Sequence, residues 1–343
     1  MALPEYKSRL NYVWQNINLS LSAFAAKLAP YLGGGGGGLT GSNFTVVSAA
    51  GTPTENATSL QAAYDAAKAI GGFTATNRYT IVVSPGYYSF PTTFLLDTPY
   101  IDVVSLTGNR DVIIDLGGAD AWPTSNPNTL LPYINVSVDN IYVRGFDTVF
   151  APSAYWGGTI KYNFKIGNNL SNIVIENCEG GLFSFGGDPS FGSNPQTVSG
   201  TFIKCEGSFQ AFAGGGTAAG TFIDCYATEG ENFGNWGTAS GLFKNCEIGT
   251  GFSDKGFGTN GLANGTFIEC VCSSRLAGQG TAAGYFLRCK AELLFDSSTF
   301  TGQAYYCIST SSPLPAVSGG GITMYCMAVG APDNQGFIAT NKL

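Results

Sequence analysis

A six-residue unit that ends in cysteine recurs along the second half of the chain. It reads GTFIKC at 200–205, GTFIDC at 220–225, GLFKNC at 241–246, GTFIEC at 265–270 and GYFLRC at 284–289. Eight cysteines form the series, with spacings of 18 to 27 residues: Cys178, Cys205, Cys225, Cys246, Cys270, Cys289, Cys307 and Cys326. A period of this length without a helical pattern is typical of a β-solenoid, in which each repeat forms one coil.

The residues around each cysteine keep the same register. A polar residue directly precedes most of the cysteines, and a small residue follows two positions later. Three positions before the cysteine, the chain places large apolar residues: Ile175, Phe202, Phe222, Phe243, Phe267 and Phe286. Equivalent residues on successive coils lie about 4.8 Å apart, so the pattern predicts stacked phenylalanines and stacked cysteines inside the solenoid. The polar residue is expected at a bend with left-handed backbone angles.

We expect the cysteines to fill space in the core and to remain reduced. Zinc sites need closely spaced cysteines or histidines, and the chain contains no histidine. Disulfides between coils are disfavoured because stacked Cβ vectors point in parallel. The ninth cysteine, Cys272, stands outside the series. No cofactor or metal site is predicted.

Net charge and hydropathy argue against binding to nucleic acid and against a membrane span. The net charge is −7 and only 16 residues are Lys or Arg, which argues against a protein that binds nucleic acid through phosphate contacts. No run of 18 apolar residues suggests a membrane span. The first residues lack the basic and apolar parts of a secretory signal, so we expect synthesis and assembly in a cytoplasm.

Residues 1–32 are predicted to form a helix that serves as an attachment or oligomerisation segment. Apolar residues recur there at alternating steps of four and three: Leu10, Trp14, Ile17, Leu21, Phe24, Leu28 and Tyr31. Residues 33–42 form a glycine-rich linker. A helix with an apolar stripe on a flexible tether indicates an anchor. The alternative, an amphipathic helix that packs on its own domain, stays open.

Residues 43–343 are predicted to form a single all-β domain behind a short helix. The helix is expected at 58–70, with Thr58 or Asn56 as its N-cap. The solenoid is expected to cover 76–330, with a turn at 85–88 and early strands at 79–84, 101–106, 111–116, 139–146 and 171–178.

This pattern resembles the right-handed parallel β-helix proteins of the pectin-lyase-like class, in particular the trimeric tailspikes of bacteriophages. The resemblance covers about residues 43–330 and rests on SLQAAYDAAKAI at 59–70, YTIVVSPGYYSF at 79–90 and NIVIENC at 172–178. It implies a right-handed parallel β-helix, a homotrimer and an N-terminal segment that binds the virion tail or capsid. The chain has no long trimerisation domain after Cys326, so the trimer rests on the class and on the N-terminal helix.

The resemblance also implies a virion protein that binds a glycan on the host surface. Exposed aromatic rings commonly stack on sugars, and the candidates are Trp122, Tyr155, Trp156 and Trp236. The same rings can instead pack on the solenoid or against another subunit. Two alternatives to a binding protein stay open, namely a polysaccharide depolymerase and a capsid decoration protein.

Hydrolysis would have to use carboxylates, because the chain has no histidine to act as a base. Glu229, Glu231 and Asp254 are the candidates in the repeat region. Glycosidases that retain configuration place two carboxylates about 5 Å apart, and inverting enzymes place them about 6.5–9.5 Å apart. Glu231 beside Lys255 on the next coil is equally consistent with an ordinary exposed ion pair. The sequence therefore favours binding without cleavage.

Overall fold

The structure is a computed structural model of the whole chain. It describes residues 43–328 apart from 116–133, 149–163, 168–169, 181–184, 186–196, 208–211, 214–215, 229–232, 235–236, 250–255, 259–260, 278–279, 296–298 and 311–320. The predicted N-terminal helix and the glycine-rich linker lie outside the described residues.

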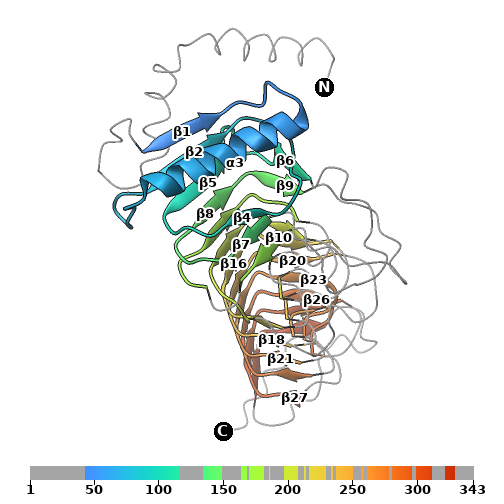
Figure 1. Cartoon of the computed structure of the whole chain (residues 1–343). Helices are drawn as coiled ribbons and strands as arrows, with labels where there is room; N and C mark the ends of the chain where they lie inside the picture. The colour runs from blue at the N-terminus through green and yellow to red at the C-terminus, as the bar shows by residue number, and fades with distance from the viewer. Residues whose placement is uncertain are drawn as a thin grey trace, which may run out of the picture. The chain divides into compact units, whose positions relative to one another are not determined.

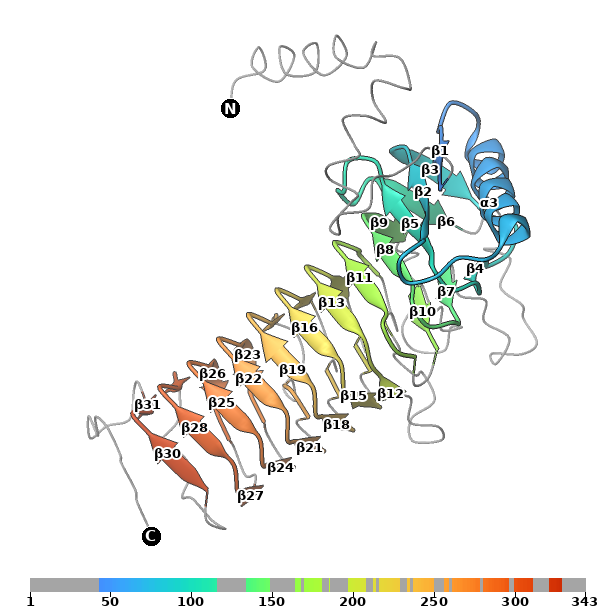
Figure 2. The same cartoon turned by 90° about the vertical axis from the view of Figure 1, so that its left-hand side faces the viewer.

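Three faces of parallel strands make up the solenoid (Figures 1 and 2). The first, called the long face, is a 12-stranded sheet. Its strands are β1 (Phe44–Val47), β2 (Tyr79–Val83), β5 (Ile101–Ser105), β8 (Tyr142–Arg144), β11 (Val174–Glu176), β13 (Thr201–Ile203), β16 (Thr221–Ile223), β19 (Leu242–Lys244), β22 (Thr266–Ile268), β25 (Tyr285–Leu287), β28 (Gln303–Tyr305) and β30 (Ile322–Met324).

The second face, called the loop face, follows the long face in each coil. Its strands form a three-stranded and a seven-stranded sheet. They are β3 (Gly86–Ser89), β6 (Val112–Asp115), β9 (Phe146–Thr148), β14 (Glu206–Gly207), β17 (Tyr226–Ala227), β20 (Glu247–Ile248), β23 (Val271–Arg275), β26 (Lys290–Leu293), β29 (Ile308–Ser309) and β31 (Met327–Ala328).

The third face, called the threonine face, leads back to the long face. It consists of a three-stranded and a six-stranded sheet. Its strands are β4 (Phe94–Leu96), β7 (Ile134–Val136), β10 (Phe164–Ile166), β12 (Thr197–Val198), β15 (Thr217–Ala218), β18 (Thr238–Ala239), β21 (Leu262–Ala263), β24 (Thr281–Ala282) and β27 (Thr299–Phe300).

Successive coils pair in parallel and in the register that the repeat predicts. On the long face Phe202 lies opposite Phe222, which is followed by Phe243 in the next coil. The early strands expected at 79–84, 101–106 and 111–116 are present. The segment expected at 139–146 contains two strands, β8 and β9, separated by Gly145. The predicted all-β solenoid is thus present from β2 to β31.

The helix α3 (Pro53–Ile70) packs against β2, β3 and β5 (Figure 1). It begins five residues earlier than predicted, and the predicted N-caps are wrong. Thr52 is the N-cap, because its side chain accepts a hydrogen bond from the Glu55 amide while Glu55 bonds back to the Thr52 amide. Tyr64 is buried in the core and accepts a bond from the Asp97 amide at 2.8 Å. Among the described residues, no helix is long and apolar enough to cross a membrane.

The predicted turn at 85–88 is wrong, because this segment forms strand β3, which pairs with β6. Gly86 is required there by a close approach. A Cβ at this position would lie 2.6 Å from the Ala49 Cβ. The signal Pro-Gly therefore marks a bend into a strand.

Stacked aromatic rings fill the centre of the solenoid. The rings of Phe202, Phe222, Phe243, Phe267 and Phe286 follow one another at 4.8–5.0 Å with nearly parallel planes. A second stack packs edge-on against the first and consists of Phe185, Phe212, Phe233 and Phe257. Offset-stacked and edge-to-face geometries are those that aromatic pairs prefer. The predicted phenylalanine stack is confirmed.

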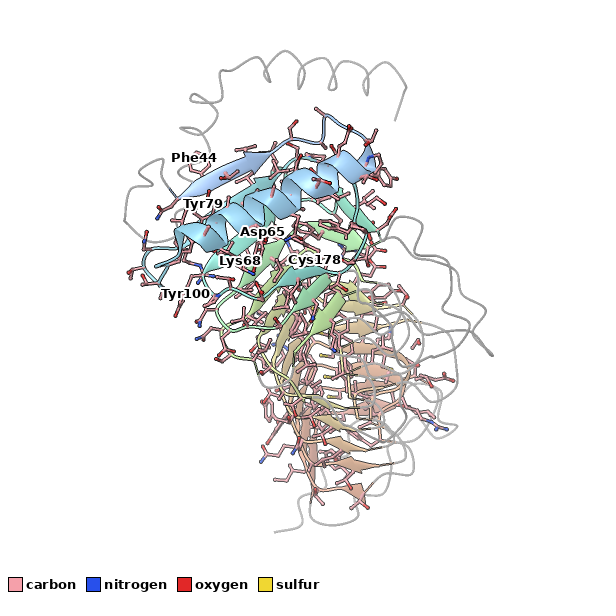
Figure 3. All side chains as sticks on the ribbon, viewed as in Figure 1. Phe44, Asp65, Lys68, Tyr79, Tyr100 and Cys178 are labelled. Carbon is pink, nitrogen blue, oxygen red and sulfur yellow. The ribbon has the colours of Figure 1, made fainter. Side chains whose placement is uncertain are left out.

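All nine cysteines are free and buried. Each Sγ of the series contacts backbone carbonyls; the Cys205 thiol, for example, donates to Ile175 O at 3.3 Å. Burial raises the pKa of the Cys178, Cys205 and Cys225 thiols above the usual value. Cys178 lies within the coil (Figure 3). The structure confirms that the cysteines form an internal ladder of thiols.

The bend between the long face and the loop face has left-handed backbone angles, as predicted. The residues there have φ between 49° and 56°: Asn177, Lys204, Asp224, Asn245, Glu269, Arg288, Tyr306 and Tyr325. Their side chains pair between coils. Asn245 donates to Asp224 at 3.1 Å, Arg288 contacts Glu269 at 3.2 Å and the rings of Tyr306 and Tyr325 stack at 5.0 Å. These contacts offset part of the cost of the left-handed conformation, about 1–2 kcal/mol per residue.

Candidate functional site

The residues that the sequence analysis selected as binding, catalytic or anchoring lie outside the described residues. They are Leu10, Trp14, Ile17, Leu21, Phe24, Leu28, Tyr31, Trp122, Tyr155, Trp156, Glu229, Glu231, Trp236 and Asp254. Their roles stay predictions. The described residues nevertheless show which strands precede the segments that carry them.

The longer connections begin at equivalent positions. Residues 116–133 follow β6, 149–163 follow β9, 229–232 follow β17 and 250–255 follow β20. All four strands belong to the loop face, and its strands pair in parallel from coil to coil. Their carboxyl ends therefore meet at a single edge, which we call the loop edge. The segments that carry Trp122, Tyr155, Trp156, Glu229, Glu231 and Asp254 follow strands that end at this edge, whereas Trp236 lies in residues 235–236, just before β18.

Three carboxylates lie in register beside the loop edge. Asp147 of β9 lies opposite Glu179, and Glu179 lies opposite Glu206 of β14. We call these residues the acid row. Their neighbours in the chain point inward, including the fully buried Cys178 and Cys205, so the carboxylates point outward. The side chains of Glu179 and Glu206 are 43% and 29% exposed, which leaves them within reach of a ligand.

Arg110 holds two members of the acid row. Its Nη1 lies 2.6 Å from Glu206 Oε2 and 3.2 Å from Glu179 Oε2, and its Nη2 donates to Lys204 O at 2.7 Å. Arg110 therefore spans from the coil of β6 to the coil of β14. Because a guanidinium presents its donors in a rigid fork, it fixes both carboxylates relative to each other.

The loop that carries Arg110 is fastened to the coils beneath it. Asn177 donates through Nδ2 to Gly108 O at 2.7 Å. Gly108 has φ of +72°, and a Cβ there would lie 2.6 Å from the Arg144 guanidinium. Arg144 also contacts Glu176, at 3.5 Å. The backbone geometry at Gly108 and this polar network therefore hold Arg110 in position.

The pKa of Asp147 is raised by its surroundings in the acid row. Partial burial, followed by the nearby negative charge of Glu179, raises the pKa of Asp147 to about 6. Arg110 remains a cation, because its bonds to Glu206 and Glu179 outweigh the effect of burial and raise its pKa. A carboxyl group with a raised pKa, about 6, therefore lies beside two carboxylates that bind a cation.

This arrangement has the parts of an acid–base site. The backbones of adjacent members of the row are one coil apart, about 4.8 Å, and those of Asp147 and Glu206 are two coils apart, about 9.6 Å. Those spacings are close to the separations used by retaining and inverting glycosidases, about 5–5.5 Å and 6.5–9.5 Å. Asp147 has the raised pKa that a general acid requires.

A purely structural role is the competing explanation for the same residues. Arg110 ties several coils together through exposed or half-buried ion pairs, and such pairs contribute only about 0–1 kcal/mol each. Farther along the row, Tyr226 and Val271 alternate with Glu247 and Lys290. An unbroken run of acidic residues is thus confined to the three coils of Asp147, Glu179 and Glu206.

The sequence analysis did not identify the acid row. Glu179 and Glu206 directly follow register cysteines, so the column was visible in the repeat. Asp147, however, lies in a coil where Phe146 takes the place of the cysteine, and Arg110 lies in a coil before the series begins. Only the pairing of β6, β9 and the later coils brings them together.

No protein-family model, curated protein or solved structure matches this chain. Within the described part of the chain, no group of three or more Cys, Asp or Glu side chains could hold a metal ion.

Proposed function

We propose that the protein is a tailspike-like, polysaccharide-binding solenoid that recognises a glycan on a host surface. The observation that carries the proposal is the position of the acid row and Arg110 directly beside the loop edge. Carboxylates and a guanidinium that already have fixed positions can bond to sugar hydroxyls with little ordering cost. Loops on a rigid scaffold commonly carry binding residues, and the segments with Trp122, Tyr155 and Trp156 start at this edge.

The shape of the solenoid suits an extended, repetitive ligand. The acid row runs from coil to coil, with its members about 4.8 Å apart. A polysaccharide chain that lies along the coils would meet the row and then Tyr226, the outward residue of the next coil. A small ligand would use only one or two coils.

A second candidate function, hydrolysis of the bound glycan, is favoured by the raised pKa of Asp147. Asp147 would donate its proton to the oxygen of the scissile glycosidic bond. Glu179, one coil away, would attack the anomeric carbon in a retaining mechanism, or Glu206, two coils away, would activate water in an inverting one. Asp147, Glu179 and Glu206 are better supported in this role than the sequence-based candidates Glu229, Glu231 and Asp254, which lie outside the described residues.

Attachment to a virion is part of the proposal through the resemblance to tailspikes. Residues 1–32 would anchor the chain to the tail or the capsid, and residues 33–42 would act as a tether. A capsid decoration protein is the remaining rival. Immunogold labelling of intact particles separates the two, since labelling at the tail supports the receptor-binding role and labelling of the capsid lattice supports decoration.

One experiment tests both binding and cleavage. Purified protein is incubated with a panel of host-envelope polysaccharides, and retention and released reducing ends are measured together. Retention that is lost in Asp147→Asn or Glu179→Gln, but kept in Glu247→Gln, supports binding at the acid row. Glu247 is the matched control because it occupies the same column outside the reach of Arg110.

Release of oligosaccharide would assign the second function. Removing the general acid should then lower the rate by about 100–10,000-fold in Asp147→Asn. The proposal fails if no polysaccharide is retained, or if Glu247→Gln lowers retention as much as the acid-row variants do.

A further inference from the structure

A six-residue connection replaces a one-residue bend at one corner of the solenoid. Residues 106–111, which we call the strap, join β5 to β6, whereas a single residue joins β8 to β9 in the next coil. Hydrogen bonds within the strap and to its base stiffen it. The Ser105 hydroxyl donates to the Asp111 carboxylate at 2.7 Å. The Thr107 hydroxyl accepts a bond from the Asn109 amide at 3.0 Å. These bonds hold the strap in one shape.

The strap lies across the corners of the coils that follow it. In the next coil, a Cβ at Gly145 would lie 2.5 Å from the Asn109 carbonyl oxygen, so the strap backbone rests directly on that bend. In the second coil, Asn177 donates through Nδ2 to the Gly108 carbonyl oxygen at 2.7 Å. The strap is therefore fastened to two coils through backbone atoms.

Arg110 extends the strap to a third coil. Its Nη2 donates to the carbonyl oxygen of Lys204 at 2.7 Å, and its Nη1 lies 2.6 Å from Glu206 Oε2. Three coil steps correspond to about 14 Å along the solenoid. The strap thus connects the coil of β5 with the coils of β8, β11 and β13. We call these four the strapped coils.

Contacts of this reach depart from the usual behaviour of a solenoid. Each repeat normally contacts only its neighbours, and stability is close to a sum of nearest-neighbour interactions. The bend pair of Asn245 with Asp224 follows that rule, because it joins adjacent coils. We propose that the strap makes the four strapped coils open as one unit. Opening of the coil of β13 then requires the rupture of bonds to a residue in the coil of β5.

Cooperative opening also keeps the acid row assembled. Asp147, Glu179 and Glu206 come from three of the strapped coils, so local opening of any one coil would take the row apart. Regions of a protein otherwise open separately, at free energies that differ from one region to the next. The proposal holds whether or not the acid row binds a glycan, because it concerns only the opening of the coils.

Two buried cysteines report on this opening in the full-length protein. Cys178 follows β11 and Cys205 follows β13, and both side chains are fully buried. A thiol reagent is added at urea concentrations below the unfolding transition, and the labelled peptides are quantified by mass spectrometry. Each rate is divided by the rate of the same cysteine in the unfolded chain. In the wild-type protein the two corrected rates should be equal, because one opening exposes both thiols.

Loss of Arg110 should separate the two rates. Arg110→Ala should make Cys205 react about tenfold faster than Cys178, because the coil of β13 loses a charged hydrogen bond and a partly exposed ion pair. Arg288→Ala is the matched control, since Arg288 pairs with Glu269 in the adjacent coil. This control should leave both rates unchanged.

Hydrogen exchange tests the reach of the strap without a change at Arg110. Asn177→Gly removes the amide that holds Gly108 and keeps the left-handed bend. Exchange of residues 101–115, two coils before the substitution, should accelerate. Asn245→Gly is the matched change at a bend that bonds only to the adjacent coil in the described contacts. Exchange of residues 201–207, again two coils before the substitution, should not change.

Three results would overturn the proposal. They are unequal corrected rates for Cys178 and Cys205 in the wild-type protein, equal rates in Arg110→Ala, and acceleration two coils away in Asn245→Gly that matches Asn177→Gly. Circular dichroism checks that each variant is folded. Should Arg110→Ala not fold, Arg110→Lys takes its place, because lysine keeps the charge and loses the fork of donors. Cys205 should then still react faster than Cys178, and equal rates would again overturn the proposal.

Discussion

Replacing Phe222 by alanine should be among the most destabilising single changes in the solenoid. Its ring is fully buried and contacts Phe202 and Phe243 face to face, at 5.0 Å each, and Phe212 and Phe233 edge to face. Truncation of a buried phenylalanine costs about 3–5 kcal/mol in general. Phe222→Ala loses four ring contacts, and the fixed spacing of the coils prevents the cavity from collapsing. We therefore expect a loss in the free energy of unfolding at the upper end of that range, about 5 kcal/mol.

The free energy of unfolding is measured by urea titration followed by circular dichroism. Phe222→Leu keeps most of the apolar volume and should cost less than half as much. Thr221→Ala changes the outward neighbour on the same strand and should stay within about 0.5 kcal/mol. Because solenoids can unfold in parts, labelling of the Cys225 thiol is followed in parallel as a local probe. A cost of Phe222→Ala below about 1 kcal/mol would show that the ring stack does not support the core.

Four further outcomes are expected. The register cysteines should resist thiol labelling without denaturant and react on unfolding; substantial disulfide content by mass spectrometry would contradict the ladder. Deleting residues 1–38 should leave a folded solenoid that no longer joins the particle, and normal incorporation of the truncated protein would refute the anchor. The folded pKa of Asp147, about 6, lies above its unfolded value. The folded form therefore binds the proton more tightly, and stability should fall as the pH rises from about 4 to 6; Asp147→Asn should remove this dependence, and an identical pH profile in the variant would contradict the raised pKa. Trp236→Ala should weaken glycan binding in a retention assay, and unchanged retention would remove Trp236 from the binding surface.

Most of the solenoid could be predicted from the sequence, because its contacts repeat at a fixed separation along the chain. Phe202 and Phe222 are neighbours in space because the 20 residues that separate them in the sequence make up one coil. The bend at Asn177 and its equivalents follows in the same way, since a left-handed residue recurs at the same corner of successive coils. The handedness of the solenoid and its trimeric state stay predictions.

Local signals were less reliable where two of them competed. The helix α3 begins at Pro53 because Thr52 and Glu55 form a capping box, and this pair outweighs Asn56 and Thr58 as possible caps. Asn56 instead donates to Tyr87 O at 3.0 Å, a contact between the helix and β3. That contact depends on how the helix packs, and no local pattern contains it.

The repeat in the sequence by itself determined the coil, its ladder of cysteines and its stack of phenylalanines, since each depends on one spacing that recurs. The addition of Asp147 and Arg110 to the column of Glu179 and Glu206 was decided by the tertiary structure alone. Arg110 and Glu206 are 96 residues apart in the sequence. They meet because the intervening coils pair in register although those coils differ in length. The raised pKa of Asp147 depends likewise on burial and on the charge of Glu179, which lies beside it in the next coil. Spacing along a chain encodes contacts that repeat, whereas a site assembled once from three coils exists only after those coils have stacked.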